Sequence, residues 1–216
     1  MDKGASYKTV IREATAELVE KKSRFIAAVR PVTTEQDAID FINAKKSEHY
    51  NATHNVYAYV ISRNNTARYS DDGEPNGTAG VPVLEIIKKE GLCDVVVVVT
   101  RYFGGTLLGA GGLIRAYGKS AKLGIDESGI TERVYCHETC LYFGYDLLGK
   151  LRYLVENGSY ILKDIQYNEA VTMLVSIPYG HLETFQKEVT ELTNGLVSVQ
   201  VTGENYIDRN VIPNTE

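Results

Sequence analysis

A run of five valines at positions 95–99 predicts a β-strand, and the residues that follow it constrain what the chain can fold into. The strand leads through Arg101 and two aromatic residues into a segment that holds five glycines, and this segment opens a helix. Glycine lets backbone approach a ligand closely, and a helix start presents free N–H groups to an anion. The arrangement therefore predicts a site for phosphate or carboxylate at the end of the strand.

The residues of this expected anion or nucleic-acid site come from both sides of the glycine segment. The strand end supplies a cation and two aromatic rings, and the helix supplies three cations within about 60° of one another, with Arg115 expected in the first turn. A solvated helix face would account for such charges equally well, so both explanations stay open. The candidate residues are Arg101, Tyr102, Phe103, Gly104, Gly105, Gly109, Gly111, Gly112, Arg115, Lys119 and Lys122.

An acidic, glycine-containing loop precedes the valine strand and carries Asp71, Asp72 and Glu74. These carboxylates could coordinate a divalent cation with phosphate, with Arg101 neutralising charge during phosphoryl transfer or hydrolysis. Asp-Gly and Pro-Asn-Gly are also strong turn formers, so the carboxylates could instead cap backbone N–H groups or pair with Arg68 or Arg101. Both alternatives stay open, and we predict neither a metal nor a cofactor.

Other patterns fail as chemical sites. Residues 109–112 begin like a dinucleotide fingerprint, but Ile114 occupies the third glycine position. Residues 118–120 resemble the end of a P-loop whose first glycine is replaced by Leu113. Residues 136–140 hold two cysteines and a histidine without a second ligand pair at zinc spacing. No nucleophile and base are brought together by the sequence, so the catalytic residues are unknown and a binding protein is favoured over an enzyme.

Length and composition fit one large domain or two small ones, because 216 residues with 44% apolar side chains can build a real core. The longest apolar run is far short of the roughly 20 residues that span a bilayer, and residues 1–6 lack an apolar signal region. Three scattered cysteines are typical of reduced thiols. We therefore expect a cytoplasmic protein without a membrane partner.

The charge is unevenly distributed along the chain. Residues 1–134 hold 18 lysines and arginines against 17 acidic residues, a net charge of +1, whereas residues 135–216 hold 5 against 11, a net charge of −6. This asymmetry favours two domains, 1–134 and 135–216, with different partners. A solvated acidic face on the second domain explains the difference equally well.

Hydrophobic periodicity predicts an α+β fold for the first domain. A capping box at residues 33–36 is expected to begin the first helix. A proline at position 82 suits the first turn of the second helix. The expected strands are 9–16, 24–29, 54–61 and the valine run, and the expected helices are 33–46, 81–89 and the segment after Gly112.

The second domain alternates strands and helices in the order β-α-β-β-α-β. Asparagine and glycine at 157–158 and 194–195 are expected to end its two helices. This order is that of the ferredoxin-like fold. The expected strands are 139–144, 160–166, 170–177 and 196–202, and the expected helices are 146–157 and 182–192.

Three segments together resemble the signature of the IMPACT family in its bacterial two-domain branch. They read KSRFI at 22–26, SDDGEPNGTAGVP at 70–82 and VVTRYFGGTLLGAGGLIRAY at 98–117. Arg115 stands where other members often carry lysine, which keeps the charge. The resemblance covers the first domain densely, whereas the second domain resembles the family only in the order of its elements.

The resemblance implies a fold and a cellular context. It implies that the first domain is similar to the second domain of the small-subunit ribosomal protein five, and that the second domain is similar to the fifth domain of elongation factor G. Two domains similar to the ribosome-facing end of a translation factor suggest a binder of RNA or of the ribosome that is linked to translation regulation. Kinship of fold is an analogy and does not establish a function.

Three functions are compatible with the sequence. In the first, the protein binds RNA or the ribosome, and its cations contact phosphates while Tyr102 or Phe103 stacks on a base. In the second, it is an enzyme that acts on a phosphorylated or nucleotide substrate with the acidic loop and Arg101. In the third, a protein partner binds the acidic second domain.

Overall fold

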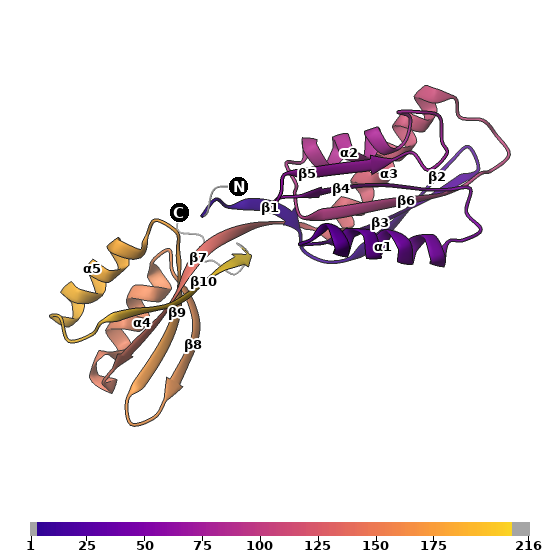
Figure 1. The fold of residues 1–216 in the computed structure, drawn as a ribbon. Coiled ribbons are helices and arrows are strands. Elements are labelled where there is room, and N and C mark those ends of the chain that lie inside the picture. Colours follow the sequence, from indigo (N-terminus) through magenta and orange to yellow (C-terminus); the bar gives the residue numbers. More distant parts are fainter. Residues whose placement is uncertain (1–3, 209–216) are drawn as a thin grey trace. The chain divides into compact units, whose positions relative to one another are not determined.

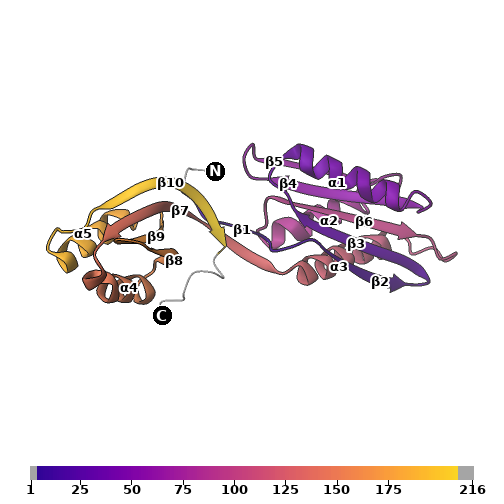
Figure 2. The same cartoon turned by 90° about the horizontal axis from the view of Figure 1, so that it is seen from below.

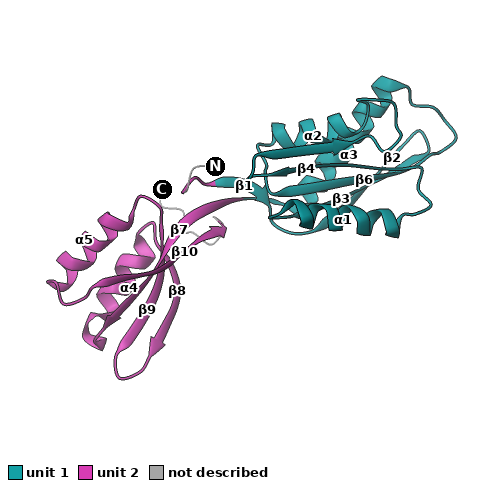
Figure 3. Ribbon diagram, viewed as in Figure 1, with its two compact units in different colours: residues 1, 7–131 teal, residues 2–6, 132–216 magenta. Residues whose placement is uncertain are grey.

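The computed structural model describes residues 4–208, and the chain divides into two compact units. Residues 7–131 belong to the first unit, and residues 4–6 and 132–208 belong to the second (Figure 3). Each unit packs helices on a β-sheet, so the predicted α+β class with two domains is confirmed. No helix within residues 4–208 is long and apolar enough to cross a membrane.

The first unit is built on a five-stranded antiparallel sheet with the strand order β2-β3-β6-β4-β5. Helix α1 covers one face of this sheet, and α2 and α3 cover the other (Figures 1 and 2). A short strand, β1, precedes the sheet, and its backbone pairs with the segment before β6. The strands are β1 (Tyr7–Val10), β2 (Ala14–Glu20), β3 (Ser23–Pro31), β4 (His54–Ile61), β5 (Thr66–Ser70) and β6 (Val95–Tyr102), and the helices are α1 (Glu35–Glu48), α2 (Gly80–Lys89) and α3 (Ala110–Ser128).

Strand β6 is the central strand, which explains its run of valines. Val95, Val97 and Val99 pack against the core beneath α2 and α3. Val96 and Val98 point to the other face and pack with α1. All five are 0% exposed, because successive side chains of a strand alternate between two faces that are both covered here.

Three expectations for the first unit need correction. The strand expected over 9–16 is two strands, because the chain bends between β1 and β2. The capping box lies one residue later than expected and consists of Thr34 and Asp37, each of which accepts the other's backbone N–H. Helix α3 already begins at Ala110, since Gly111 and Gly112 are themselves helical, so Arg115 lies in the second turn rather than the first.

The second unit has the expected ferredoxin-like order of elements. Strand β7 pairs with β9 and β10, and β8 pairs with β9, all antiparallel, in the order β10-β7-β9-β8. Both helices lie on one face of this sheet (Figure 1), where Leu151 and Phe185 enter a core with Leu141 and Met173. The elements are β7 (Ile130–Phe143), the 3-10 turn η1 (Tyr145–Leu147), α4 (Leu148–Asn157), β8 (Ile161–Tyr167), β9 (Val171–Pro178), α5 (Leu182–Thr193) and β10 (Val199–Asp208).

Two strand boundaries of this unit differ from the expected ones. Strand β7 starts at Ile130 instead of 139, and β10 covers Val199–Asp208 instead of 196–202. The two strands pair with each other from Leu141 and Val199 to Arg133 and Asp208. The added segments are rich in polar residues, so their strand structure comes from cross-strand pairing and not from an apolar pattern.

Candidate functional site

The acidic loop and the end of β6 meet in a buried ion pair. Arg101 is 5% exposed and Glu74 is 8% exposed. The Nη1 group of Arg101 donates to Oε1 of Glu74 at 2.6 Å, and the hydroxyl of Tyr117 on α3 donates to the same oxygen at 2.7 Å. The Nη2 group of Arg101 is 3.3 Å from Oγ of Ser23. The charge of Arg101 is therefore neutralised inside the unit.

Aromatic and imidazole groups complete the surroundings of this pair. The guanidinium carbon of Arg101 lies 5.5 Å from the ring centre of Phe25 and 5.6 Å from that of Phe103. Nε2 of His54 lies 3.8 Å from Oε2 of Glu74. Burial, followed by the adjacent Glu74 carboxylate, raises the pKa of Tyr117, so its hydroxyl remains a hydrogen-bond donor. These contacts fasten the acidic loop to β6 and α3.

The other two carboxylates of the loop also have structural partners. Asp71 accepts backbone N–H groups of Gly77, Ala79 and Gly80 at 2.8 to 3.1 Å, and so caps the start of α2. Asp72 accepts from Nζ of Lys46 at 2.7 Å and from the backbone N–H of Asn55 at 2.6 Å. The cap-and-pair alternative thus accounts for Asp71, Asp72 and Glu74. Residues 4–208 contain no group of three or more His, Cys, Asp or Glu placed to hold a metal ion.

The glycine segment packs directly against the turn between β2 and β3. A Cβ atom on Gly104 would lie 2.0 Å from the carbonyl carbon of Lys22, so only glycine fits there. Lys21 and Lys22 form the turn with φ angles of 46° and 68°. Gly105 and Gly109 also have positive φ angles, of 79° and 72°. Close packing at Gly104 holds the two lysines beside the start of α3.

A cavity of about 240 Å³ lies between this turn and α3. Its lining includes Lys21 from the turn, Arg115 and Lys119 from α3, and one carboxylate, Glu20. Within the described part of the chain, these three cations and Lys22 form neither ion pairs nor hydrogen bonds through their side chains. We refer to Lys21, Lys22, Arg115 and Lys119 as the basic surface.

The remaining predicted residues of the site, Lys122, Tyr102 and Phe103, have different surroundings. Lys122 is paired with Asp126 at 2.6 Å and with Glu90 at 3.2 Å, so carboxylates already match its charge, and these contacts raise its pKa. The hydroxyl of Tyr102 lies 3.0 Å from Nδ1 of His49. Phe103, in contrast, is 46% exposed and follows the end of β6. Of the two candidate stacking rings, Phe103 is the more exposed, since Tyr102 is partly buried.

The residues expected at the anion site did not include Lys21 and Lys22. A signal was available in the IMPACT-like segment at 22–26, which lies far from the glycine segment along the chain. Leu107, between the glycines, was also missed as a surface feature and is 83% exposed. Its exposure leaves an apolar side chain beside the basic surface.

The cysteine segment is part of β7. Cys136 and Cys140 share one face of the strand, whereas His137 points to the opposite face, as alternation requires. Burial raises the pKa of Cys136 to about 11 and that of Cys93 to about 12, so both remain protonated thiols at neutral pH.

Comparison with known proteins places this arrangement in a family. Residues 21–125 match the family described as Impact N-terminal domain, and residues 141–196 match a domain of unknown function, DUF1949. The chain is 44% identical over 207 residues to IMPACT family member YvyE of Bacillus subtilis (strain 168), with 95% of each chain covered. The chain belongs to the IMPACT family.

Two further comparisons, one with a solved structure and one with a eukaryotic relative, define how far the likeness extends. A crystal structure described as that of a hypothetical protein superposes with a TM-score of 0.59 at 28% identity, over 91% of this chain and 97% of that one. The Protein IMPACT homolog of Dictyostelium discoideum is 38% identical over 97 residues, which are 43% of this chain and 28% of that protein. The Impact N-terminal match includes the basic surface, the acidic loop and the glycine segment.

Proposed function

We propose that this IMPACT family member binds RNA, free or within the ribosome, through the basic surface, and that it acts in translation regulation. One observation carries the proposal: Lys21, Arg115 and Lys119 line one cavity with a single carboxylate, Glu20, and no ion pair joins these cations to an acidic group of the described residues. Lys22 follows Lys21 in the turn whose backbone packs on Gly104. Most other cations of the first unit, including Lys46, Arg101 and Lys122, are matched by acidic groups. Unmatched cations can exchange their counterions for phosphates, which is the main source of affinity for nucleic acids.

The neighbours of the basic surface suit a single-stranded or unpaired segment of RNA. Exposed Phe103 offers a ring on which a base can stack, a contact that contributes about 1–3 kcal/mol per base. Gly105, Gly109 and Gly111 are exposed and leave the backbone open to a phosphate. In this proposal Arg101 and Glu74 hold the end of β6 in place, and the basic surface contacts the RNA. We expect the protein to bind this RNA in the cytoplasm.

The test is the salt dependence of binding to a fluorescently labelled single-stranded RNA. Four phosphate contacts predict a slope of log K against log salt of about −3, since each contact contributes about −0.7. The double variant Lys21→Gln/Lys119→Gln should reduce the magnitude of the slope to about 1.4. The control Lys88→Gln/Lys89→Gln makes the same charge change at the end of α2. A flat slope for the unaltered protein, or equal losses in both double variants, would contradict the proposal.

The enzyme alternative receives less support from the geometry. It requires an acidic residue working beside Arg101, and Glu74 fills that place in a buried pair with a hydroxyl donor already bound. Asp71 and Asp72 face other partners. We therefore propose binding and name no catalytic residue.

A further inference from the structure

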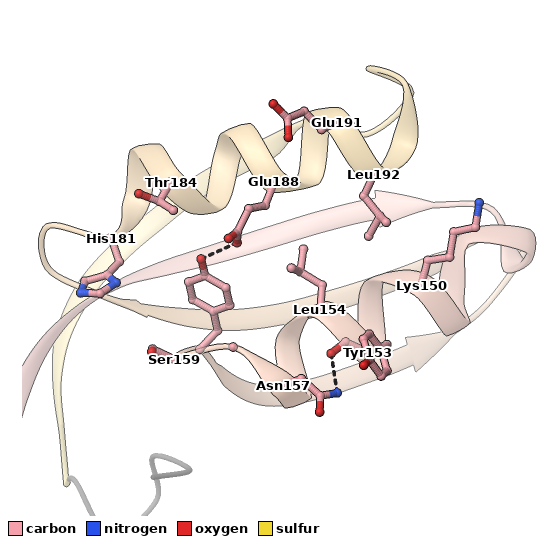
Figure 4. A pocket seen from close by; sticks show the side chains of 12 residues that line it. Lys150, Tyr153, Leu154, Asn157, Ser159, His181, Thr184, Glu188, Glu191 and Leu192 are labelled. Atoms are coloured by element: carbon pink, nitrogen blue, oxygen red, sulfur yellow. Dashed lines mark hydrogen bonds between the residues drawn. The ribbon is translucent and has the colours of Figure 1, made fainter. Parts of the chain in front are cut away.

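The second unit contains a cavity of about 750 Å³ between α4 and α5 (Figure 4). All residues of the RNA proposal lie in the first unit, so this cavity is independent of it. Its volume falls within the range of about 300–1,000 Å³ that is typical of small-molecule sites, which also occur between packed helices. Its lining combines leucine and tyrosine side chains with seven polar or charged residues, which are Lys150, Asn157, Ser159, His181, Thr184, Glu188 and Glu191.

Two leucines and two tyrosines, Tyr153 and Tyr160, form the apolar part of the lining. Leu154 extends from α4 and Leu192 from α5, and both side chains point into the space between the helices (Figure 4). Tyr160, at the end of the loop after α4, is only 4% exposed. Its ring packs edge-on against Phe185 of the core, with ring centres 4.5 Å apart. The position of the ring is thereby fixed before any ligand arrives.

Two carboxylates line this cavity, and only one of them has a cation partner in residues 4–208: Oε1 of Glu191 lies 3.9 Å from Nζ of Lys187, whereas Glu188 has no such partner. Glu188 of α5 points into the cavity (Figure 4), and its Oε2 accepts the hydroxyl of Tyr160 at 2.6 Å. No lysine, arginine or histidine of residues 4–208 lies within ion-pair distance of Glu188. Burial and the bond to Glu188 raise the pKa of Tyr160, so the phenol stays a donor to the carboxylate. A carboxylate beside apolar side chains favours a cationic ligand. The carboxylate attracts the positive charge more strongly there, because less water lies between the two charges to screen them.

We propose that the cavity between α4 and α5 binds a small organic cation, with one ammonium or guanidinium group against Glu188 and an apolar body between Leu154 and Leu192. The two ends of the cavity define the size of the ligand. Lys150 lies at one end and His181 at the other (Figure 4), and Lys150 repels a second positive charge there. A compact molecule with a single charge fits this pattern better than a basic peptide that continues past either end.

The test uses the full chain and three probes of nearly equal shape, 4-phenylbutylamine, 4-phenylbutanol and 4-phenylbutyrate. Binding is followed by NMR chemical-shift titration. The amine should bind at least tenfold more tightly than the alcohol, and the acid should bind more weakly than both, with shifts concentrated on α4 and α5. Glu188→Gln keeps an oxygen for the hydroxyl of Tyr160 but removes the charge, so it should reduce the preference for amine over alcohol to less than twofold.

Glu183→Gln is the matched control, because Glu183 is exposed on the same helix and does not line the cavity. This variant should keep the tenfold preference for the amine. Equal affinity of the unaltered chain for amine and alcohol, or shifts located in the first unit, would overturn the proposal without any variant. Tighter binding of an acetylated peptide, Ala-Leu-Lys-Leu-Lys-Leu-Ala amide, than of the amine would overturn the choice of a free small molecule.

Discussion

Replacing Arg101 with alanine tests whether its charge holds the fold or meets RNA. The side chains of Arg101 and Glu74 are 6% and 3% exposed, so water cannot take the place of the missing partner. Removing one partner of a buried pair leaves the other charge unmatched and costs about 3–5 kcal/mol. Glu74 would keep only the hydroxyl of Tyr117 at 2.7 Å and Nε2 of His54 at 3.8 Å. We therefore expect a large loss of stability in the first unit.

The loss can be expressed as a change in melting temperature. Residues 7–131 make up 125 residues of the first unit. At about 2.1 cal/mol/K per residue, the unfolding entropy of the unit is about 0.26 kcal/mol/K. A stability loss of about 3–5 kcal/mol therefore lowers its melting temperature by about 11–19 °C. Differential scanning calorimetry measures this shift. The double variant Arg101→Met/Glu74→Gln should lose about 2 kcal/mol less free energy of unfolding than the single variants Arg101→Met and Glu74→Gln lose together, because the double variant leaves no unpaired buried charge.

RNA affinity gives the second measurement on the same variant. At a temperature where Arg101→Ala is still folded, the slope of log K against log salt should equal that of the unaltered protein. A melting temperature unchanged within 2 °C, together with a slope reduced in magnitude by about 0.7, would refute the reasoning, since Arg101 would then be a phosphate contact and not a structural one.

Three further predictions concern stability. Asp71→Ala removes the acceptor of three backbone N–H groups at the start of α2 and should lower the free energy of unfolding by about 2 kcal/mol in guanidinium titrations. Gly104→Ala should destabilise the first unit, whereas Gly111→Ala in α3, where a Cβ would meet only the end of the Arg115 side chain at 3.7 Å, should stabilise it by about 0.5–1 kcal/mol; equal effects would contradict the packing argument. Burial and the bond to Glu35 raise the pKa of Tyr59 to about 12, so the folded chain holds this proton more tightly than the unfolded chain. Stability should then fall as the pH rises from about 10 to about 12, and Tyr59→Phe should weaken this dependence in alkaline unfolding, whereas a control Tyr50→Phe should not.

The parts of the fold with strong local patterns could be predicted from the sequence. The valine strand, the helices and the ferredoxin-like order follow from apolar periodicity and from glycine or asparagine at helix ends. Strand β5 was missed, because Thr66–Ser70 has no continuous apolar pattern and is a strand only through its pairing with β4. Cross-strand pairing of this kind is a tertiary effect that local patterns do not contain.

The candidate site was predictable only in part, and Arg101 shows why. A charged residue among glycines is typical of a surface, yet Arg101 follows Val97 and Val99 at a period of two, so it points to the same buried face. The basic surface was harder to predict, because Lys21 and Arg115 are 94 positions apart in the sequence. The packing of the turn against Gly104 brings these two elements together, and no local pattern indicates it.

Mapping the contacts of bound RNA shows whether the basic surface is the RNA-binding site. The full chain, incubated with cell extract, is crosslinked by ultraviolet light, and the modified peptides are identified by mass spectrometry. We expect RNA-linked residues within 20–24 and 103–119, with recovery strongly reduced in Lys21→Gln/Lys119→Gln and unchanged in Lys88→Gln/Lys89→Gln. Crosslinks confined to the second unit, or equal recovery from both double variants, would contradict this expectation.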